Sequence, residues 1–138
     1  MDFKEAAEEH GIQWRVIPPP FTLFVQGDGP VIKHRVIINF VDNAFRYTSR
    51  GGAVELGYKV ESPWFIGYVK DTGPGIPKER IKTIFERGTQ GEEKNKGTMG
   101  LGLYNVAKVI EAHGGKVWVE SEVGKGTTFY FSLPLSEK

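Results

Sequence analysis

The stretch FIGYVKDTGPGIP, residues 65–77, raises the first structural question of this sequence. Its opening residues, FIGYV, are apolar or aromatic around one glycine, which is typical of a strand. The strand ends on a carboxylate, Asp71, and two glycines and two prolines follow within six residues. An ordinary turn needs fewer special residues. The corner is therefore either a tight turn or one wall of a ligand pocket, and the rest of the chain has to decide between them.

The composition predicts one soluble, folded domain spanning residues 1–138. Of the residues, 39% are hydrophobic and 25% are charged, a balance typical of a protein with a packed core. The net charge of +1 gives no electrostatic reason to expect nucleic acid or an anionic membrane as the main partner. The chain has no cysteine, and no apolar run approaches the roughly 20 residues that span a bilayer. We therefore expect a cytoplasmic domain, with the membrane status of a full-length parent left open.

Hydrophobic periodicity predicts helices and strands mixed along the chain. The helix expected at 31–47 is apolar on two neighbouring rows and is therefore largely buried. The segment RGTQGEEKNKGT (87–98) has no large apolar residue, which indicates a mobile loop. Further helices are expected at 2–10, 77–85 and 99–115, and strands at 12–17, 21–26, 53–60, 64–70, 116–122 and 127–134. The sequence thus predicts an α+β fold, a two-layer α/β sandwich in which a mixed sheet of about five strands packs on about three helices.

Polar side chains form one stripe on the otherwise apolar central helix. Asn39, Asn43, Arg46 and Tyr47 are spaced at i, i+4, i+7 and i+8, so they share a face. Amides that face a packed interior cost about 1–3 kcal/mol if they lack partners. Together with a cation they could hold an anion and its counter-ion, since an amide oxygen is a suitable ligand for Mg²⁺. For the two asparagines alone, a solvated helix face is the simpler interpretation.

Two glycine-containing segments are candidate ligand contacts. At the strand end, Gly73 and Gly75 let the backbone approach a flat ligand while Asp71 accepts hydrogen bonds, for example from the exocyclic amine of adenine. Asp also forms turns in such sequences, so the corner alone decides nothing. The segment KGTMGLGL (96–103) leads from the predicted loop into a helix, whose free N–H groups suit a phosphate chain. A flexible loop joined to a helix explains that segment alone equally well.

Taken together and in this order, these segments would serve one ligand, and at this point the sequence resembles a known family. From about Asp28 to Pro134 it is similar to the ATP-binding catalytic domain of sensor histidine kinases, a branch of the Bergerat-fold superfamily that includes DNA gyrase, mismatch-repair ATPases and a heat-shock chaperone family. NFVDNAFRYT resembles the asparagine box, DTGPGIP the first glycine box, IFERG part of the phenylalanine box, and GTMGLGL the second glycine box. The family's closing strands resemble EAHGGKVWVESEVGKGTTFYFSLP.

The resemblance implies ATP and Mg²⁺ as ligands and assigns the polar helix face to them. Asn43 would hold Mg²⁺ and Asn39 would line the triphosphate. Arg46 stands where the family usually has Lys, and it would contact phosphate with a different geometry. Tyr47 would pack near the base or the ribose. Asn39, Asn43 and Arg46 are thus the expected catalytic residues.

The remaining expected ligand contacts follow from the same resemblance. Asp71 would bind the adenine amine, and Thr127 matches a family threonine behind it. The base pocket would be shaped by Gly73, Gly75 and Ile76. A lid at about 87–99 would cover the phosphates, and the phosphate side would comprise Lys94, Lys96, Gly97, Thr98, Gly100, Leu101 and Gly102. One departure is visible, because the family often has a second Phe shortly after Phe85, and here Gly88 follows.

The reaction implied is phosphoryl transfer. Superfamily members that hydrolyse ATP usually place a Glu, as general base, where this chain has Asn39, and an amide cannot accept a proton. The family's phosphoacceptor box is absent, since EEHGIQ, IKHRVI and EAHGGK do not fit it. We therefore expect the catalytic part of a two-component kinase, monomeric, acting on a histidine of a separate dimerisation domain that passes the phosphoryl group to a response regulator. The alternatives are an ATP-hydrolysing switch, an anti-sigma-type Ser/Thr kinase, and a docking module without activity.

Overall fold

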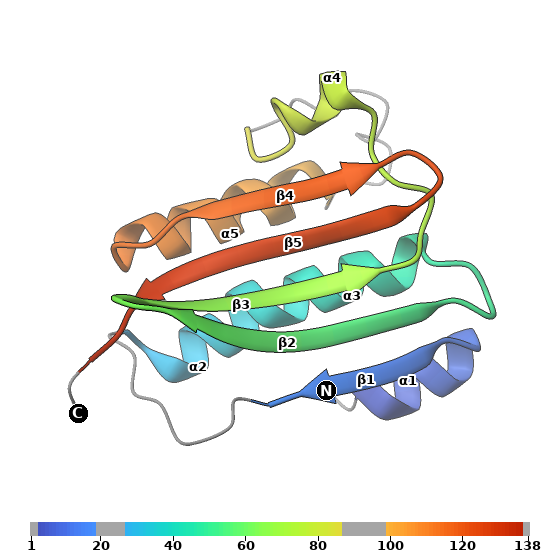
Figure 1. Ribbon diagram of the computed structural model, residues 1–138, viewed down its shortest axis with the longest axis horizontal. Coiled ribbons are helices and arrows are strands. Elements are labelled where there is room, and N and C mark those ends of the chain that lie inside the picture. The colour runs from blue at the N-terminus through green and yellow to red at the C-terminus, as the bar shows by residue number, and fades with distance from the viewer. Residues whose placement is uncertain (1–2, 19–26, 87–98, 137–138) are drawn as a thin grey trace.

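A mixed sheet with helices on one face forms the architecture (Figure 1). The computed structural model describes residues 3–18, 27–86 and 99–136. The sheet has five strands in the order β1-β2-β3-β5-β4, with β1 parallel to β2 and all other neighbours antiparallel. The strands are β1 (Gln13–Ile17), β2 (Ala53–Glu61), β3 (Trp64–Asp71), β4 (Val117–Glu122) and β5 (Gly126–Pro134). The predicted α+β sandwich with a mixed sheet is confirmed.

Most of the helices cover the face of the sheet that lies behind the strands in Figure 1, whereas the helix labelled α4 lies beyond the β4 edge. The helices are α1 (Phe3–His10), α2 (Gly29–Ile32), the π-helical η1 (Lys33–Ile37), α3 (Ile38–Tyr47), α4 (Lys78–Ile81) and α5 (Met99–Ala112). Alternate residues of each strand point toward these helices, as the period of two along a strand requires. The core therefore joins α3 to the central strands, and the ring of Phe40 stacks on that of Phe129 with centroids 5.1 Å apart.

The central helix runs without interruption through α2, η1 and α3, from Gly29 to Tyr47. It begins two residues earlier than predicted, because the side chain of Asp28 accepts a hydrogen bond from the Val31 N–H at 3.2 Å and Pro30 fits the first turn. His113, at the end of α5, accepts a hydrogen bond from the Asp28 N–H at its Nε2. Its Nδ1 donates to the Val109 carbonyl, as expected of a structural residue at a helix end.

Two predicted helices are shorter in the structure. The helix expected at 77–85 ends at Ile81 and continues as tighter turns, such as the bonds from Thr83 N–H to Arg80 O at 3.1 Å and from Glu86 N–H to Thr83 O at 2.9 Å. The helix expected at 99–115 ends at Ala112, because Gly114 has a φ of 85° that stops it. The strand expected at 21–26 and the loop expected at 87–98 lie outside the described residues. No helix in the described part of the chain has the length and apolarity to cross a bilayer.

Candidate functional site

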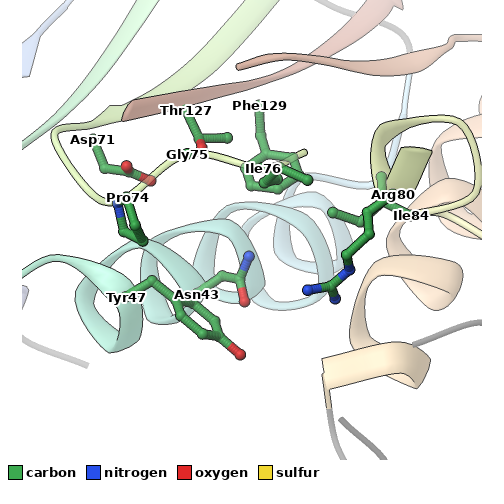
Figure 2. A pocket seen from close by; sticks show the side chains of 10 residues that line it. All are labelled: Asn43, Tyr47, Asp71, Pro74, Gly75, Ile76, Arg80, Ile84, Thr127 and Phe129. Carbon is green, nitrogen blue, oxygen red and sulfur yellow. The ribbon is translucent and has the colours of Figure 1, made fainter. Parts of the chain in front are cut away.

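A cavity of about 200 Å³ opens between α3, the end of β3 and the segment that leads into α4 (Figure 2). Its lining combines a carboxylate, an amide and a guanidinium with apolar and aromatic surface. The lining residues are Asn43, Tyr47, Asp71, Pro74, Gly75, Ile76, Arg80, Ile84, Thr127 and Phe129. Helix, strand end and corner segment thus meet at one place, as the sequence predicts for a pocket.

Asp71 is the buried acid of this cavity. It is the last residue of β3, on the inner face of the sheet, where it pairs with Val54 on one side and Thr127 on the other. Only 6% of its surface is exposed. Burial raises the pKa of the Asp71 carboxyl, and hydrogen bonds from the backbone N–H groups of Gly73 and Thr127 partly offset that rise. A carboxylate kept in such a place is a strong acceptor for a ligand N–H group.

The corner after Asp71 is fastened to the turn between β4 and β5. The N–H of Gly124 donates to the Pro74 carbonyl at 2.8 Å, and the Ile76 N–H donates to Ser121 Oγ at 2.8 Å. Gly75 has a φ of 84°, and a Cβ placed on it would lie 2.3 Å from the Glu122 carbonyl oxygen. Only glycine fits there. The corner is therefore both a tight turn and a wall of the pocket, which answers the question posed by the sequence.

Two of the four residues in the predicted polar stripe line the cavity, and the other two do not. Asn43 and Tyr47, one turn apart on α3, line the cavity. Asn39 lies one turn earlier, and its Nδ2 donates to the Arg35 carbonyl at 2.7 Å. Its Oδ1 faces the start of α5, where a Cβ on Gly102 would lie 3.8 Å away. The structure thus places Asn39 between the cavity and the glycine-led helix.

Arg46 is exposed and is not among the described residues that line the cavity. It acts on Asp42, four residues earlier on α3. Burial raises the pKa of the Asp42 carboxyl, and the charge of Arg46 partly counteracts that rise. The four members of the predicted stripe therefore lie in different surroundings, with only Asn43 and Tyr47 on the cavity wall.

The remaining predicted contacts divide in a similar way. Gly75, Ile76 and Thr127 line the cavity, and Gly73 lies beside it through its bond to Asp71. Gly100, Leu101 and Gly102 belong to the first turn of α5. The predicted contacts at Lys94, Lys96, Gly97 and Thr98 lie outside the described residues.

Four lining residues were not predicted: Pro74, Arg80, Ile84 and Phe129. Phe129 could have been found, because it follows Thr127 by two residues on a strand and so points to the same face. Arg80 and Ile84 could not have been found in this way, because α4 ends at Ile81 and the turns after it bring Ile84 to the cavity. Ile84 is fully buried and Phe85 meets the Phe129 ring edge-on, with centroids 6.1 Å apart. The single Phe of the expected phenylalanine box therefore docks α4 on the core.

The sequence is similar to a known protein family and to two sensor kinases. The family described as histidine kinase-, DNA gyrase B- and HSP90-like ATPases matches residues 28–137. The adaptive-response sensory kinase SasA of Crocosphaera subtropica is 40% identical over 113 residues, 80% of this chain and 29% of that protein. The sensor protein SrrB of Staphylococcus aureus is 40% identical over 75% of this chain and 18% of that protein. The chain therefore spans less than a third of the length of these relatives.

Solved structures show the same fold. The nucleotide-free catalytic domain of the histidine kinase ThkA superposes with a TM-score of 0.83 and 33% identity, covering 96% of this chain and 84% of that domain. The full-length kinase ShkA in complex with AMPPNP superposes with a TM-score of 0.83 and 29% identity, covering 96% of this chain and 27% of that one.

Proposed function

The chain belongs to the family of histidine kinase-, DNA gyrase B- and HSP90-like ATPases, as a catalytic domain of the sensor histidine kinase type. We propose that it binds ATP in the cavity and donates the γ-phosphoryl group. ATP and Mg²⁺ are the ligands of the cavity, and the γ-phosphoryl group passes to a histidine on a dimerisation and phosphoacceptor domain. The full-length protein then hands the phosphoryl group to a response regulator.

The base binds at Asp71, and the burial of this acid in the cavity is the observation that carries the proposal. Its carboxylate accepts a hydrogen bond from the adenine amine while the Gly73 N–H holds one carboxylate oxygen. Ile76 and Gly75 provide the flat apolar surface that a purine needs, and Thr127 lies behind the acid in the next strand. Tyr47, on the opposite wall, packs beside the base or the ribose.

Asn43 is the residue of this cavity that suits Mg²⁺. Its amide oxygen is a hard, neutral ligand, and Mg²⁺ keeps most of its waters while it shares phosphate oxygens, so one side-chain ligand is enough. What the ion supplies is neutralisation of charge on the phosphates. Asn39, whose Oδ1 lies near the first turn of α5, lines the triphosphate, and the free N–H groups at a helix start suit its phosphate oxygens.

Phosphoryl transfer is favoured over hydrolysis by the chemistry of Asn39. Neither atom of its amide can accept a proton at neutral pH, and its Nδ2 already donates to the Arg35 carbonyl. A water molecule near the γ-phosphate would therefore lack a general base at this position. The domain holds and orients ATP, and Arg46, which does not line the cavity, adds positive charge, as do the lysines Lys94 and Lys96 of the expected lid.

The experiment is a transfer assay with γ-labelled ATP and Mg²⁺. The chain is incubated alone and then with the phosphoacceptor domain of its own full-length protein, made separately. We expect acid-labile label on the acceptor domain, little label on this chain and little free phosphate. Acid-stable label would indicate a Ser/Thr kinase, and rapid release of phosphate without transfer would indicate a hydrolysing switch. We also expect the isolated chain to be a monomer. In the source cell, we expect this domain to be cytoplasmic.

A further inference from the structure

We propose that Arg80 binds the phosphate chain of the nucleotide next to the ribose, from the wall opposite α3. The proposal rests on the function proposed above, because it takes the base to lie at Asp71. Arg80 belongs to α4 and is half-buried, and it lines the same cavity as Asn43 and Asp71. Figure 2 shows its guanidinium directed into the cavity toward the α3 side, away from Asp71.

The position of Arg80 is fixed by packing. Ile84 follows it by four residues and is 1% exposed, and Phe85 contacts the Phe129 ring edge-on. These two residues dock the turns after α4 on the core, and the Arg80 carbonyl accepts the Thr83 N–H at 3.1 Å. The base of the Arg80 side chain is therefore held, while its guanidinium extends over the cavity.

The charges of the cavity are separated along its length. Among the described lining residues, Asp71 is the only acid and Arg80 the only cation. An adenine amine at Asp71 puts the negative phosphates at the other end, past Asn43 on one wall and Arg80 on the other. A guanidinium presents paired N–H donors that match two phosphate oxygens, and it stays charged at any working pH.

The shared cavity limits which phosphates Arg80 can contact. Arg80 and Asp71 line the same cavity, so a base at Asp71 brings the phosphates nearest the ribose toward Arg80. The proposed contact therefore falls on the α- and β-phosphates, which ADP and ATP share. Half-burial strengthens it relative to a contact with the exposed Arg46, because water screens the charge less.

The test compares adenosine, ADP and ATP as ligands of the same variants, by competition with a fluorescent nucleotide. Arg80→Gln should weaken ADP and ATP binding by about 10- to 100-fold, the usual effect of losing a charged hydrogen-bond pair, and leave adenosine unchanged. Arg80→Lys should recover part of the loss, because a single ammonium keeps the charge without the fork. The matched control is Lys78→Gln, an exposed cation on the same helix, which should change nothing.

Equal ADP affinity in Arg80→Gln and the unchanged protein would overturn the inference. So would an equal loss of adenosine and ADP, since that would mean Arg80 only shapes the pocket. Asp71→Asn separates this failure from failure of the proposed function. If Asp71→Asn loses adenosine while Arg80→Gln keeps ADP, only the role of Arg80 is wrong. If Asp71→Asn binds adenosine normally, the base is not at Asp71, and the proposed function fails with it.

Discussion

The backbone N–H of Gly73 donates a hydrogen bond to Oδ1 of Asp71 at 2.8 Å, two residues back along the chain. This bond helps to hold the carboxyl group of a buried strand end, and the same residue lines the cavity. A small residue suits this position, since a Cβ on Gly73 would lie 3.0 Å from that same oxygen and 3.1 Å from the Tyr47 carbonyl oxygen, both tight contacts. The corner therefore presents the acid that defines the site.

Asp71→Asn is expected to remove most of the nucleotide affinity. The replacement keeps the volume and one acceptor oxygen, but its NH₂ group replaces the oxygen that would face the adenine amine. The loss of a hydrogen bond to a charged acceptor corresponds to about 1.5–3 kcal/mol, or roughly 10- to 150-fold in affinity. Titration with a fluorescent ATP analogue measures it. Unchanged affinity would mean that the base binds elsewhere.

In the absence of nucleotide, the stability of the same variant relative to the natural sequence should increase as the pH rises from about 4 toward 7. Because the folded pKa of Asp71 is raised, the unfolded carboxyl ionises first as the pH rises above about 4. Asp71 thus contributes stability below its unfolded pKa, and this contribution is lost as the pH rises through the folded pKa.

Urea unfolding of both proteins from pH 3.5 to 8 tests this sign. The free energy of unfolding of Asp71→Asn minus that of the natural sequence should increase as the pH rises above about 4. The difference should become constant once the folded carboxyl has also ionised. A difference that shrinks as the pH rises would show that the folded protein favours the charged carboxylate.

Asn43→Ala is expected to remove chiefly the Mg²⁺ dependence of binding. The substitution deletes the amide oxygen on the cavity wall while it leaves Asp71 and the base pocket intact. Alanine is also a good residue in the middle of α3, so the helix should tolerate it. Titrations with and without Mg²⁺ should give similar affinities for the variant and different ones for the natural sequence. A variant that still binds more tightly with Mg²⁺ would place the ion elsewhere.

Gly75→Ala and Gly124→Ala form a matched pair. Both glycines have a positive φ, 84° and 86°, so each alanine has the same backbone strain of about 1–2 kcal/mol. A Cβ on Gly124 meets nothing within 4 Å, whereas one on Gly75 would lie 2.3 Å from the Glu122 carbonyl oxygen. Gly75→Ala should therefore lower the free energy of unfolding by roughly 1–3 kcal/mol more than Gly124→Ala, and should also weaken nucleotide binding. Equal losses in thermal or urea unfolding would show that the corner can move away from the β4–β5 turn.

Asn39→Glu is expected to raise ATP hydrolysis. A carboxylate between the cavity and α5 could accept a proton from water, which the natural amide cannot. A general base typically contributes 10²- to 10⁴-fold, and an added one that is less well oriented should contribute less. Phosphate release is the measurement, with Asn39→Gln as the control that keeps an amide. Hydrolysis in the natural sequence that already matches the Glu variant would favour the hydrolysing alternative.

The outline of the fold could be read from the sequence because its signals are local. The apolar run FIGYV and the helical rows around Val41 and Phe45 depend on neighbours within a few residues, and the structure forms a strand and a helix at these places. The end of α4 at Ile81 was missed, because tertiary docking of Ile84 and Phe85 decides it. Propensity along the chain does not report such contacts.

The site was predicted less completely, for a similar reason. Asp71, Gly75 and Asn43 stand out as residue types that an ordinary strand or helix does not need, and the structure brings them to one cavity. Arg80 carries no such signal, since a cation on a short surface helix is ordinary. Its place on the cavity wall depends on where the corner after Asp71 positions α4, and only the structure describes that.

The most direct test is a crystal structure of the chain with Mg²⁺ and a non-hydrolysable ATP analogue. The account predicts the adenine amine within hydrogen-bond distance of the Asp71 carboxylate, with the triphosphate running past Asn43. A base bound at any other position, with Asp71 facing only solvent or protein, would contradict it.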